Sequence, residues 1–113
     1  MKQRILIIDD ETDFCFIMKN FFSKKGYDVS LAYTLKEGMT ILKEFRPHIL
    51  FLDNNLPDGM GWIEAENIHR KFPKMNITLI SAYQTPKDFK AHLSMTINIL
   101  EKPISLNDIE KYL

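Results

Sequence analysis

The chain has 113 residues, which suits one domain because two domains of half that length would each lack an adequate core. Hydrophobic residues make up 45% of the chain and charged residues 27%, which is typical of a folded globular protein and excludes a disordered tail. The 15 Lys and Arg residues balance 15 Asp and Glu residues, so no net charge attracts the chain to nucleic acid or to anionic membranes.

Cysteine usage and hydropathy point to a reducing compartment. The single Cys15 cannot form an internal disulfide, and no Cys or His pair has zinc-site spacing. The longest apolar runs, residues 5–8 and 49–52, are far shorter than the roughly 20 residues that span a bilayer. No signal peptide opens the chain, and we therefore expect a cytoplasmic protein without membrane contact.

Apolar runs alternate with segments of helical period from the first residues onward. Residues 4–8 are apolar at nearly every position, which predicts a strand covered on both faces. A helix is expected over residues 12–25, where Gly26 ends it. Residues 27–32 then lead into the second strand.

The middle of the chain repeats this alternation. Thr34 and Glu37 have the spacing of a capping box, which predicts a helix that ends near Phe45. Residues 49–52 form an entirely apolar third strand. Residues 54–61 contain one proline and two glycines and are expected to form a loop.

The last third of the chain predicts a helix over residues 62–71 and a strand over residues 77–80. Thr85 is expected to cap a fourth helix, and residues 97–100 to form the fifth strand. Ser105 begins a final helix, which we expect to be cut short by the chain end, so that residues 1–113 are one domain with a truncated last helix.

Five strands alternating with five helices predict an α/β fold with a doubly wound parallel sheet. Ligands of such sheets bind outside the carboxyl ends of the strands, so the residues that follow each strand are the informative ones. These residues are Asp9, Asp10, Asp53, Ser81 and Lys102.

Three carboxylates in one place need a cation, because two unit charges about 4 Å apart repel by roughly 4 kcal/mol at an effective dielectric of 20. Mg²⁺ suits this set, since it is bound by one or two carboxylates together with a phosphate oxygen. Lys102 and Ser81 are suited to an oxyanion beside the metal. The combination favours phosphoryl transfer, with Asp53 as the nucleophile.

In their order and spacing, these motifs resemble the receiver domain of two-component response regulators over nearly the whole chain. The matching motifs are Asp9-Asp10, Asp53 at the end of its strand, Leu56-Pro57-Asp58-Gly59 with Gly61 after it, Ser81-Ala82 and Lys102-Pro103. The resemblance implies a flavodoxin-like sheet with strand order 2-1-3-4-5. It also implies a signalling module that catalyses only its own phosphorylation and dephosphorylation, and so is not an enzyme.

The resemblance assigns a role to each site residue. Asp53 would accept a phosphoryl group from a histidine kinase or a phosphotransfer protein. Asp10 would bind Mg²⁺ or Mn²⁺ directly, Asp9 mainly through water, and the Asn55 backbone carbonyl would complete the ligands. Asp53 itself would also contact the metal. Ser81 and Lys102 would hold the phosphoryl oxygens.

The chain departs from the family pattern at Ile99, where receiver domains usually carry a Tyr or Phe that acts as a rotameric switch. The switch candidates are therefore Ser81, Tyr83 and Ile99, and output through this face is in question. The face made by the fourth helix, the fifth strand and the fifth helix is also a candidate surface for a homodimer.

The first predicted helix is unusually rich in apolar residues. Its expected inward stripe consists of Phe14, Ile17, Met18, Phe21 and Phe22. Cys15 and Phe16 extend the apolar surface beyond that stripe. We expect the phosphodonor to contact the acidic pocket and this helix through Phe14, Phe16 and Ile17, while closer packing by a neighbouring helix remains the alternative.

Three other functions remain open. A flavin-binding protein of the same topology would need a phosphate-cradling loop after the first strand, where Asp9, Asp10, Glu11 and Asp13 would repel phosphate. A phosphatase with an aspartyl nucleophile shares the metal chemistry but needs a partner domain to enclose its substrate. A degenerate receiver that only binds proteins is opposed by the intact set of strand-end residues, although Ile99 keeps it open.

Overall fold

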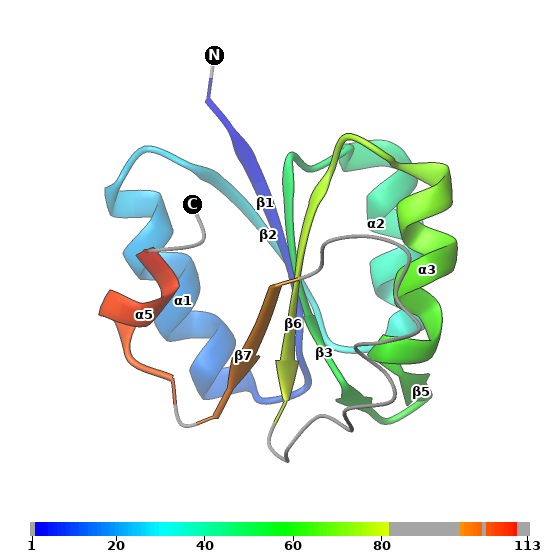
Figure 1. The fold of residues 1–113 in the computed structure, drawn as a ribbon. Helices are drawn as coiled ribbons and strands as arrows, with labels where there is room; N and C mark the ends of the chain where they lie inside the picture. The colour runs from blue at the N-terminus through cyan, green and yellow to red at the C-terminus, as the bar shows by residue number, and fades with distance from the viewer. Residues whose placement is uncertain (1, 82–97, 103, 111–113) are drawn as a thin grey trace.

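The computed structural model describes residues 2–81, 98–102 and 104–110. Its centre is a sheet of five parallel strands in the order β2-β1-β3-β6-β7, which runs through the middle of Figure 1. The strands are β1 (Arg4–Ile8), β2 (Asp28–Ala32), β3 (Ile49–Asp53), β6 (Asn76–Ser81) and β7 (Asn98–Glu101). Because β6 and β7 are the fourth and fifth strands of this sheet, the order is the predicted 2-1-3-4-5, and the α/β fold is confirmed.

Helices cover both faces of the sheet. The described helices are α1 (Thr12–Lys24), α2 (Leu35–Phe45), α3 (Gly61–Lys71) and α5 (Leu106–Glu110). Helices α1 and α5 lie on one side of the sheet, and α2 and α3 lie on the other (Figure 1). The predicted fourth helix, which would begin at Thr85, lies outside the described residues.

The central strands explain why the apolar runs show no polar alternation. Ile5 and Ile7 belong to the core cluster on the side of α1 and α5, and Phe51 of β3 joins them. Leu6 and Ile8 belong to the cluster on the side of α2 and α3. Both faces of β1 and β3 are therefore buried, as expected of strands covered by helices on both sides.

The predicted helix ends are confirmed where backbone geometry decides them. Gly26, which follows the C-cap residue Lys25 of α1, has a φ of 94°, a conformation that favours glycine. Thr34 is the N-cap of α2, and its hydroxyl accepts a 3.1 Å hydrogen bond from the Glu37 N–H. At the other end of α2, Arg46 takes the left-handed conformation and its N–H donates to the Leu42 carbonyl.

The prediction that residues 54–61 form only a loop is wrong. The short strands β4 (Asn55–Leu56) and β5 (Gly59–Met60) pair antiparallel, and Gly61 is already the first residue of α3. The turn between them is the two-residue segment Pro57–Asp58, a length that closes tight hairpins. Proline and glycine marked the turn correctly but gave no sign that the flanking residues would pair.

The predicted inward stripe of α1 is also partly wrong. Ile17 was expected inside but is 53% exposed, and Cys15 was expected outside but is fully buried. Successive residues of a helix are rotated by about 100°, and the buried face of α1 is centred near Met18. Cys15 lies about 60° to one side of Met18 and is inside the buried face, whereas Ile17 lies about 100° to the other side and is outside it. The second apolar residue outside the stripe, Phe16, is 65% exposed, as expected.

None of the helices in the described ranges is long and apolar enough to cross a membrane.

Candidate functional site

The strand register places the strand-end aspartates at one edge of the sheet. Ile8 of β1 pairs with Leu52 of β3, so the next residues along each strand, Asp9 and Asp53, lie level with each other. Asp53 in turn pairs with Ile80 of β6. The strand-end residues, far apart in the sequence, therefore converge at the edge to which the β6 and β7 arrows point in Figure 1.

Asp9, Asp10 and Asp53 form a compact acidic cluster. One carboxylate oxygen from each residue lies within 4.8 Å of the others. Asp9 is fully buried and Asp53 is 3% exposed, whereas Asp10 is exposed. The cluster thus consists of two buried carboxylates and one that is exposed to solvent.

Backbone groups fix the two buried carboxylates. The Glu11 N–H donates to Asp9 Oδ1 at 2.9 Å, and the Asn55 N–H donates to Asp53 Oδ1 at 3.2 Å. Each contact runs from the residue two positions later, the pattern of an Asx turn. Asp9 Oδ2 is buried and accepts no aligned hydrogen bond among the described residues, and the Lys102 ammonium lies 3.3 Å from it, so this oxygen is an acceptor suited to a cation.

Burial and mutual repulsion disfavour charge in this pocket. Burial, followed by the negative charge of Asp9, raises the pKa of Asp53 to about 7, although Lys102 opposes the shift. Burial likewise raises the pKa of Asp9 above its ordinary value. A bound divalent cation reverses this preference because it stabilises the ionised carboxylates.

Lys102 supplies the fixed positive charge of the site. Its N–H donates to the Ser81 carbonyl at 2.7 Å, which anchors the residue beside the end of β6. Its Nζ lies 3.3 Å from Asp9 Oδ2 and 5.2 Å from the centre of the Phe14 ring. Burial alone would lower the pKa of Lys102, but the hydrogen bond to Glu11 and the surrounding carboxylates raise it, so the ammonium stays charged.

The other predicted site residues fall at the same edge or outside the described ranges. Ser81 is buried as the last residue of β6, and Asn55 is exposed at the start of β4. Ile99 is half-buried in β7 and packs against the core cluster on the side of α2 and α3. Tyr83 lies outside the described residues.

The segment after Asp53 is fixed by a close backbone approach. A Cβ at Gly61 would collide with the Asp53 carbonyl oxygen and would lie 2.8 Å from Leu52 Cγ. The Gly61 N–H donates to the Asn54 carbonyl at 2.9 Å, and the Asn54 side chain accepts from the Trp62 N–H. Glycine at position 61 therefore lets α3 start directly against the strand that carries Asp53.

Sequence reasoning missed three contacts around the site. Lys102 Nζ donates to Glu11 Oε1 at 2.8 Å, and the buried Cys15 thiol donates to the Asp9 carbonyl at 3.2 Å. Asp58 accepts hydrogen bonds from the first two N–H groups of α2, which ties the hairpin to that helix. For the contact between Lys102 and Glu11, the one hint in the sequence was that the acidic run after the first strand continues from Asp10 to Glu11.

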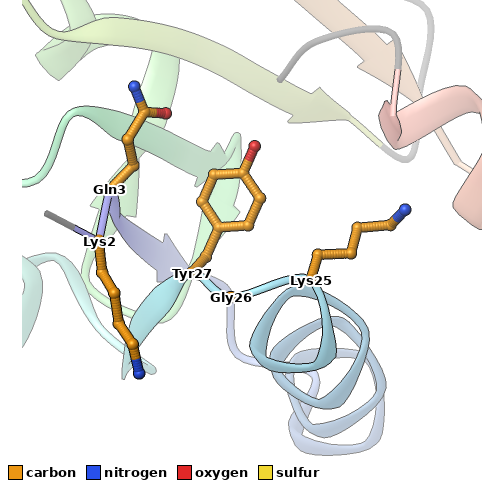
Figure 2. Close-up of a pocket in the computed structure, with 5 residues that line it drawn as sticks. All are labelled: Lys2, Gln3, Lys25, Gly26 and Tyr27. Carbon is orange, nitrogen blue, oxygen red and sulfur yellow. The ribbon is translucent and has the colours of Figure 1, made fainter.

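A pocket of about 570 Å³ lies at the opposite edge of the sheet, beside the start of β1 (Figure 2). It is lined by Lys2, Gln3, Lys25, Gly26 and Tyr27. Lys25 forms an ion pair with Glu110 of α5. None of these five lining residues has a carboxylate side chain, and none belongs to the acidic cluster.

Fold and cluster together define a class of signalling module, and comparison with known families agrees. Residues 5–113 match the family model of the response regulator receiver domain. The chain therefore belongs to this family of two-component signalling modules, which the strand-end motifs predicted.

Similar proteins include regulators of this kind. The photosynthetic apparatus regulatory protein RegA of Rhodobacter capsulatus is 26% identical over 106 residues, and the chain spans 58% of its length. A CheY-like receiver domain of Methanospirillum hungatei JF-1 superposes with a TM-score of 0.89 at 26% identity, covering 98% of this chain and 90% of that one.

A response regulator of Burkholderia pseudomallei was solved with a phosphorylated aspartic acid, a calcium ion and citrate. It shares the fold with a TM-score of 0.84 at 20% identity, covering 99% of this chain and 66% of that one.

Proposed function

We propose that Asp53 is the phosphoacceptor of this receiver domain and that Asp9, Asp10 and Asp53 bind Mg²⁺ or Mn²⁺. The observation that carries the proposal is the cluster of carboxylate oxygens within 4.8 Å of one another, which includes the fully buried Asp9 and has only the single ammonium of Lys102, 3.3 Å from Asp9 Oδ2, to offset its charge among the described residues. Oxygen ligands of this kind suit a hard divalent cation.

Of the three carboxylates, Asp53 is best suited to be the nucleophile. It ends β3 between the strands that carry Asp9 and Ser81, so the metal ligands lie on one side of it and the hydroxyl on the other. An Asp53 carboxylate oxygen attacks the donor phosphorus, a new O–P bond forms, and the P–N bond of a phosphohistidine breaks while its electron pair returns to the imidazole.

The remaining residues stabilise the transferred group. The metal ion, when bound, neutralises charge on the phosphoryl oxygens. The Lys102 ammonium provides a second positive charge, and the Ser81 hydroxyl provides a hydrogen-bond donor to an oxygen of the same group. The Asn55 carbonyl is proposed as the last protein ligand, because its peptide N–H already contacts Asp53. The Burkholderia pseudomallei structure, with its phosphorylated aspartic acid and calcium ion, supports this chemistry by analogy.

The proposed phosphodonor is a histidine kinase or phosphotransfer protein that contacts the start of α1. Phe16 and Ile17 are 65% and 53% exposed, beside the loop that carries Asp10. Phe14 contributes less than expected, because it is half-buried and its ring packs against Lys102. A free, buried Cys15 is consistent with the reducing cytoplasm as the site of action.

For the output, we propose a conformational change centred on Ser81 and β7. Ile99 is stiff at its first torsion and packs on the core, so it does not exchange between a buried and a wet pose as tyrosine can. Movement of Ser81 toward the phosphoryl group would instead shift β7 as a unit. The face made by β7, α5 and the predicted fourth helix is proposed to change on phosphorylation and to form the interface of a homodimer.

Incubation with acetyl phosphate and Mg²⁺, read by intact mass, tests this function. We expect one added phosphoryl group that is lost in the Asp53→Asn variant and when EDTA removes the metal. Asp13→Asn is the matched control, because Asp13 is an exposed acidic residue in the first turn of α1. An unchanged mass gain in Asp53→Asn would contradict the assignment.

A further inference from the structure

Glu11 contacts the Lys102 ammonium beside the acidic cluster of Asp9, Asp10 and Asp53. Lys102 Nζ donates a 2.8 Å hydrogen bond to Glu11 Oε1. Its 3.3 Å ion pair with Asp9 Oδ2 is not aligned as a hydrogen bond, because that oxygen has no hydrogen-bond partner among the described residues. Lys102 therefore contacts both Glu11 and Asp9, and its shorter, aligned contact is the one with Glu11.

We propose that Glu11 is a positioning residue that competes with the phosphoryl group for Lys102 and so favours the unphosphorylated state. This inference rests on the proposed function of Asp53. The phosphoryl group brings new negative charge to Asp53, and Lys102 must turn from Glu11 to contact it. A contact that is stronger in one state than in the other shifts the equilibrium toward the first state.

The burial of the partners makes this competition reversible. The Glu11 side chain is 59% exposed, whereas the Lys102 side chain is 15% exposed. Released from the lysine, the Glu11 carboxylate is solvated by water, so the contact restrains Lys102 only modestly. The Phe14 ring beside Nζ is a further contact of the ammonium and carries no charge that competes with the phosphoryl group.

The backbone of Glu11 is fixed independently of its side chain. Its N–H donates to Asp9 Oδ1, and its carbonyl accepts a 3.0 Å hydrogen bond from the Cys15 N–H at the start of α1. Substitution of the carboxylate by an amide therefore removes the charge and leaves both backbone contacts in place. Glu11→Gln is the variant of choice for this reason.

Titration with beryllofluoride at saturating Mg²⁺, followed by ¹⁹F NMR, tests the proposal on the whole chain. We expect Glu11→Gln to lower the half-saturating beryllofluoride concentration about two- to fivefold, the range expected when a partly exposed ion pair is removed. Asp13→Asn removes the same charge from the neighbouring turn and should change the value much less. An unchanged or higher value in Glu11→Gln, or an equal gain in Asp13→Asn, would overturn the proposal.

A second measurement shows whether the effect passes through Lys102. Without Glu11 the ammonium moves toward the carboxylates, so calorimetry should show weaker Mg²⁺ binding in Glu11→Gln than in Asp13→Asn. In a Lys102→Ala background this difference should disappear, and its persistence would contradict the mechanism. Wild-type protein that binds no beryllofluoride at all would instead refute the proposed function, and the inference with it.

Discussion

Asp53 combines a buried position with a charge that its reaction requires. Burial and the neighbouring Asp9 raise its pKa to about 7, so in the absence of a cation the folded chain binds a proton there that the unfolded chain has released. Between about pH 4 and pH 7, stability therefore falls as pH rises, and the full penalty is present above pH 7. The buried carboxylate that the reaction requires therefore destabilises the folded chain when no metal ion is bound.

Asp53→Asn should stabilise the metal-free chain at pH 8 by about 1 to 2 kcal/mol, because it removes a buried charge without changing the shape of the side chain. The gain should be smaller at pH 5, where the folded chain already holds the proton. Thermal unfolding in EDTA at both pH values measures the difference, with the exposed Asp28→Asn as control. A gain that is equal at both pH values would show that Asp53 charge is not its source.

Residue types at strand ends were readable from the sequence, but the directions of their side chains were not. The apolar strands placed Asp9, Asp53 and Lys102 at one edge, because parallel strands share their carboxyl ends. Glu11 reaches Lys102, 91 positions along the chain, from a loop that has no periodicity to read. Asp58 could not be assigned to α2 for the same reason.

At the scale of elements, the β4–β5 hairpin joins the segment after Asp53 to the N-terminus of α2. Asp58 accepts hydrogen bonds from the Leu35 and Lys36 N–H groups at 2.8 and 3.0 Å. These bonds, first of all the one from Leu35, lower the pKa of Asp58. An acid with a lowered pKa stabilises the folded state above its unfolded pKa, and this contribution is lost as pH falls through the folded value.

Asp58→Asn should therefore lower the melting temperature at pH 7, because an amide accepts these two N–H groups less well than a carboxylate does. The difference from wild type should shrink as the pH is lowered below the folded pKa of Asp58. Differential scanning calorimetry across this range measures it. A difference that stays constant with pH would mean that the carboxylate charge does not hold α2.

Helix α1 shows both the strength and the limit of periodicity. Its range was predicted within one residue, and Met18 and Phe22 of the predicted inward stripe are buried. The stripe was nevertheless rotated from the true face, because it included the exposed Ile17 and left out the buried Cys15. Because 13 residues carry so many apolar side chains, several stripes fit the sequence equally well. Only packing against the sheet selects one of them and leaves Ile17 exposed.

The exposed part of α1 predicts a difference between donors. Phe16→Ser should slow phosphoryl transfer from a cognate phosphohistidine protein several-fold, because it removes an apolar contact of the proposed interface. It should spare acetyl phosphate, which needs no such surface. Ile63→Ser is the matched control, since Ile63 is 63% exposed on α3, across the sheet from α1. Rapid-quench assays measure the transfer rate from each donor. The proposal would be contradicted if Phe16→Ser left both rates unchanged or slowed both equally.

At the scale of the whole molecule, the strand order of the sheet brings residues that are far apart in the sequence together in one site. Strand β1 pairs with both β2 and β3, so the acidic pair after β1 lies next to Asp53, while β6 and β7 bring Ser81 and Lys102 from the other side. Two layers of helices bury both faces of the sheet, and the acidic cluster lies beyond the strand ends, where Asp10 is exposed to solvent. The sheet order therefore brings the strand-end residues together, and contacts from the loops fix the orientation of their side chains.

The central claim, that Asp53 and no other carboxylate of the cluster accepts the phosphoryl group, can be tested by chemical trapping. Borohydride reduces an aspartyl phosphate to homoserine and leaves free aspartate unchanged. After reaction with acetyl phosphate and Mg²⁺, peptide mass mapping should find homoserine at position 53, with Asp9 and Asp10 intact. Homoserine at Asp9 or Asp10, or a phosphorylated protein with aspartate retained at position 53, would contradict the account.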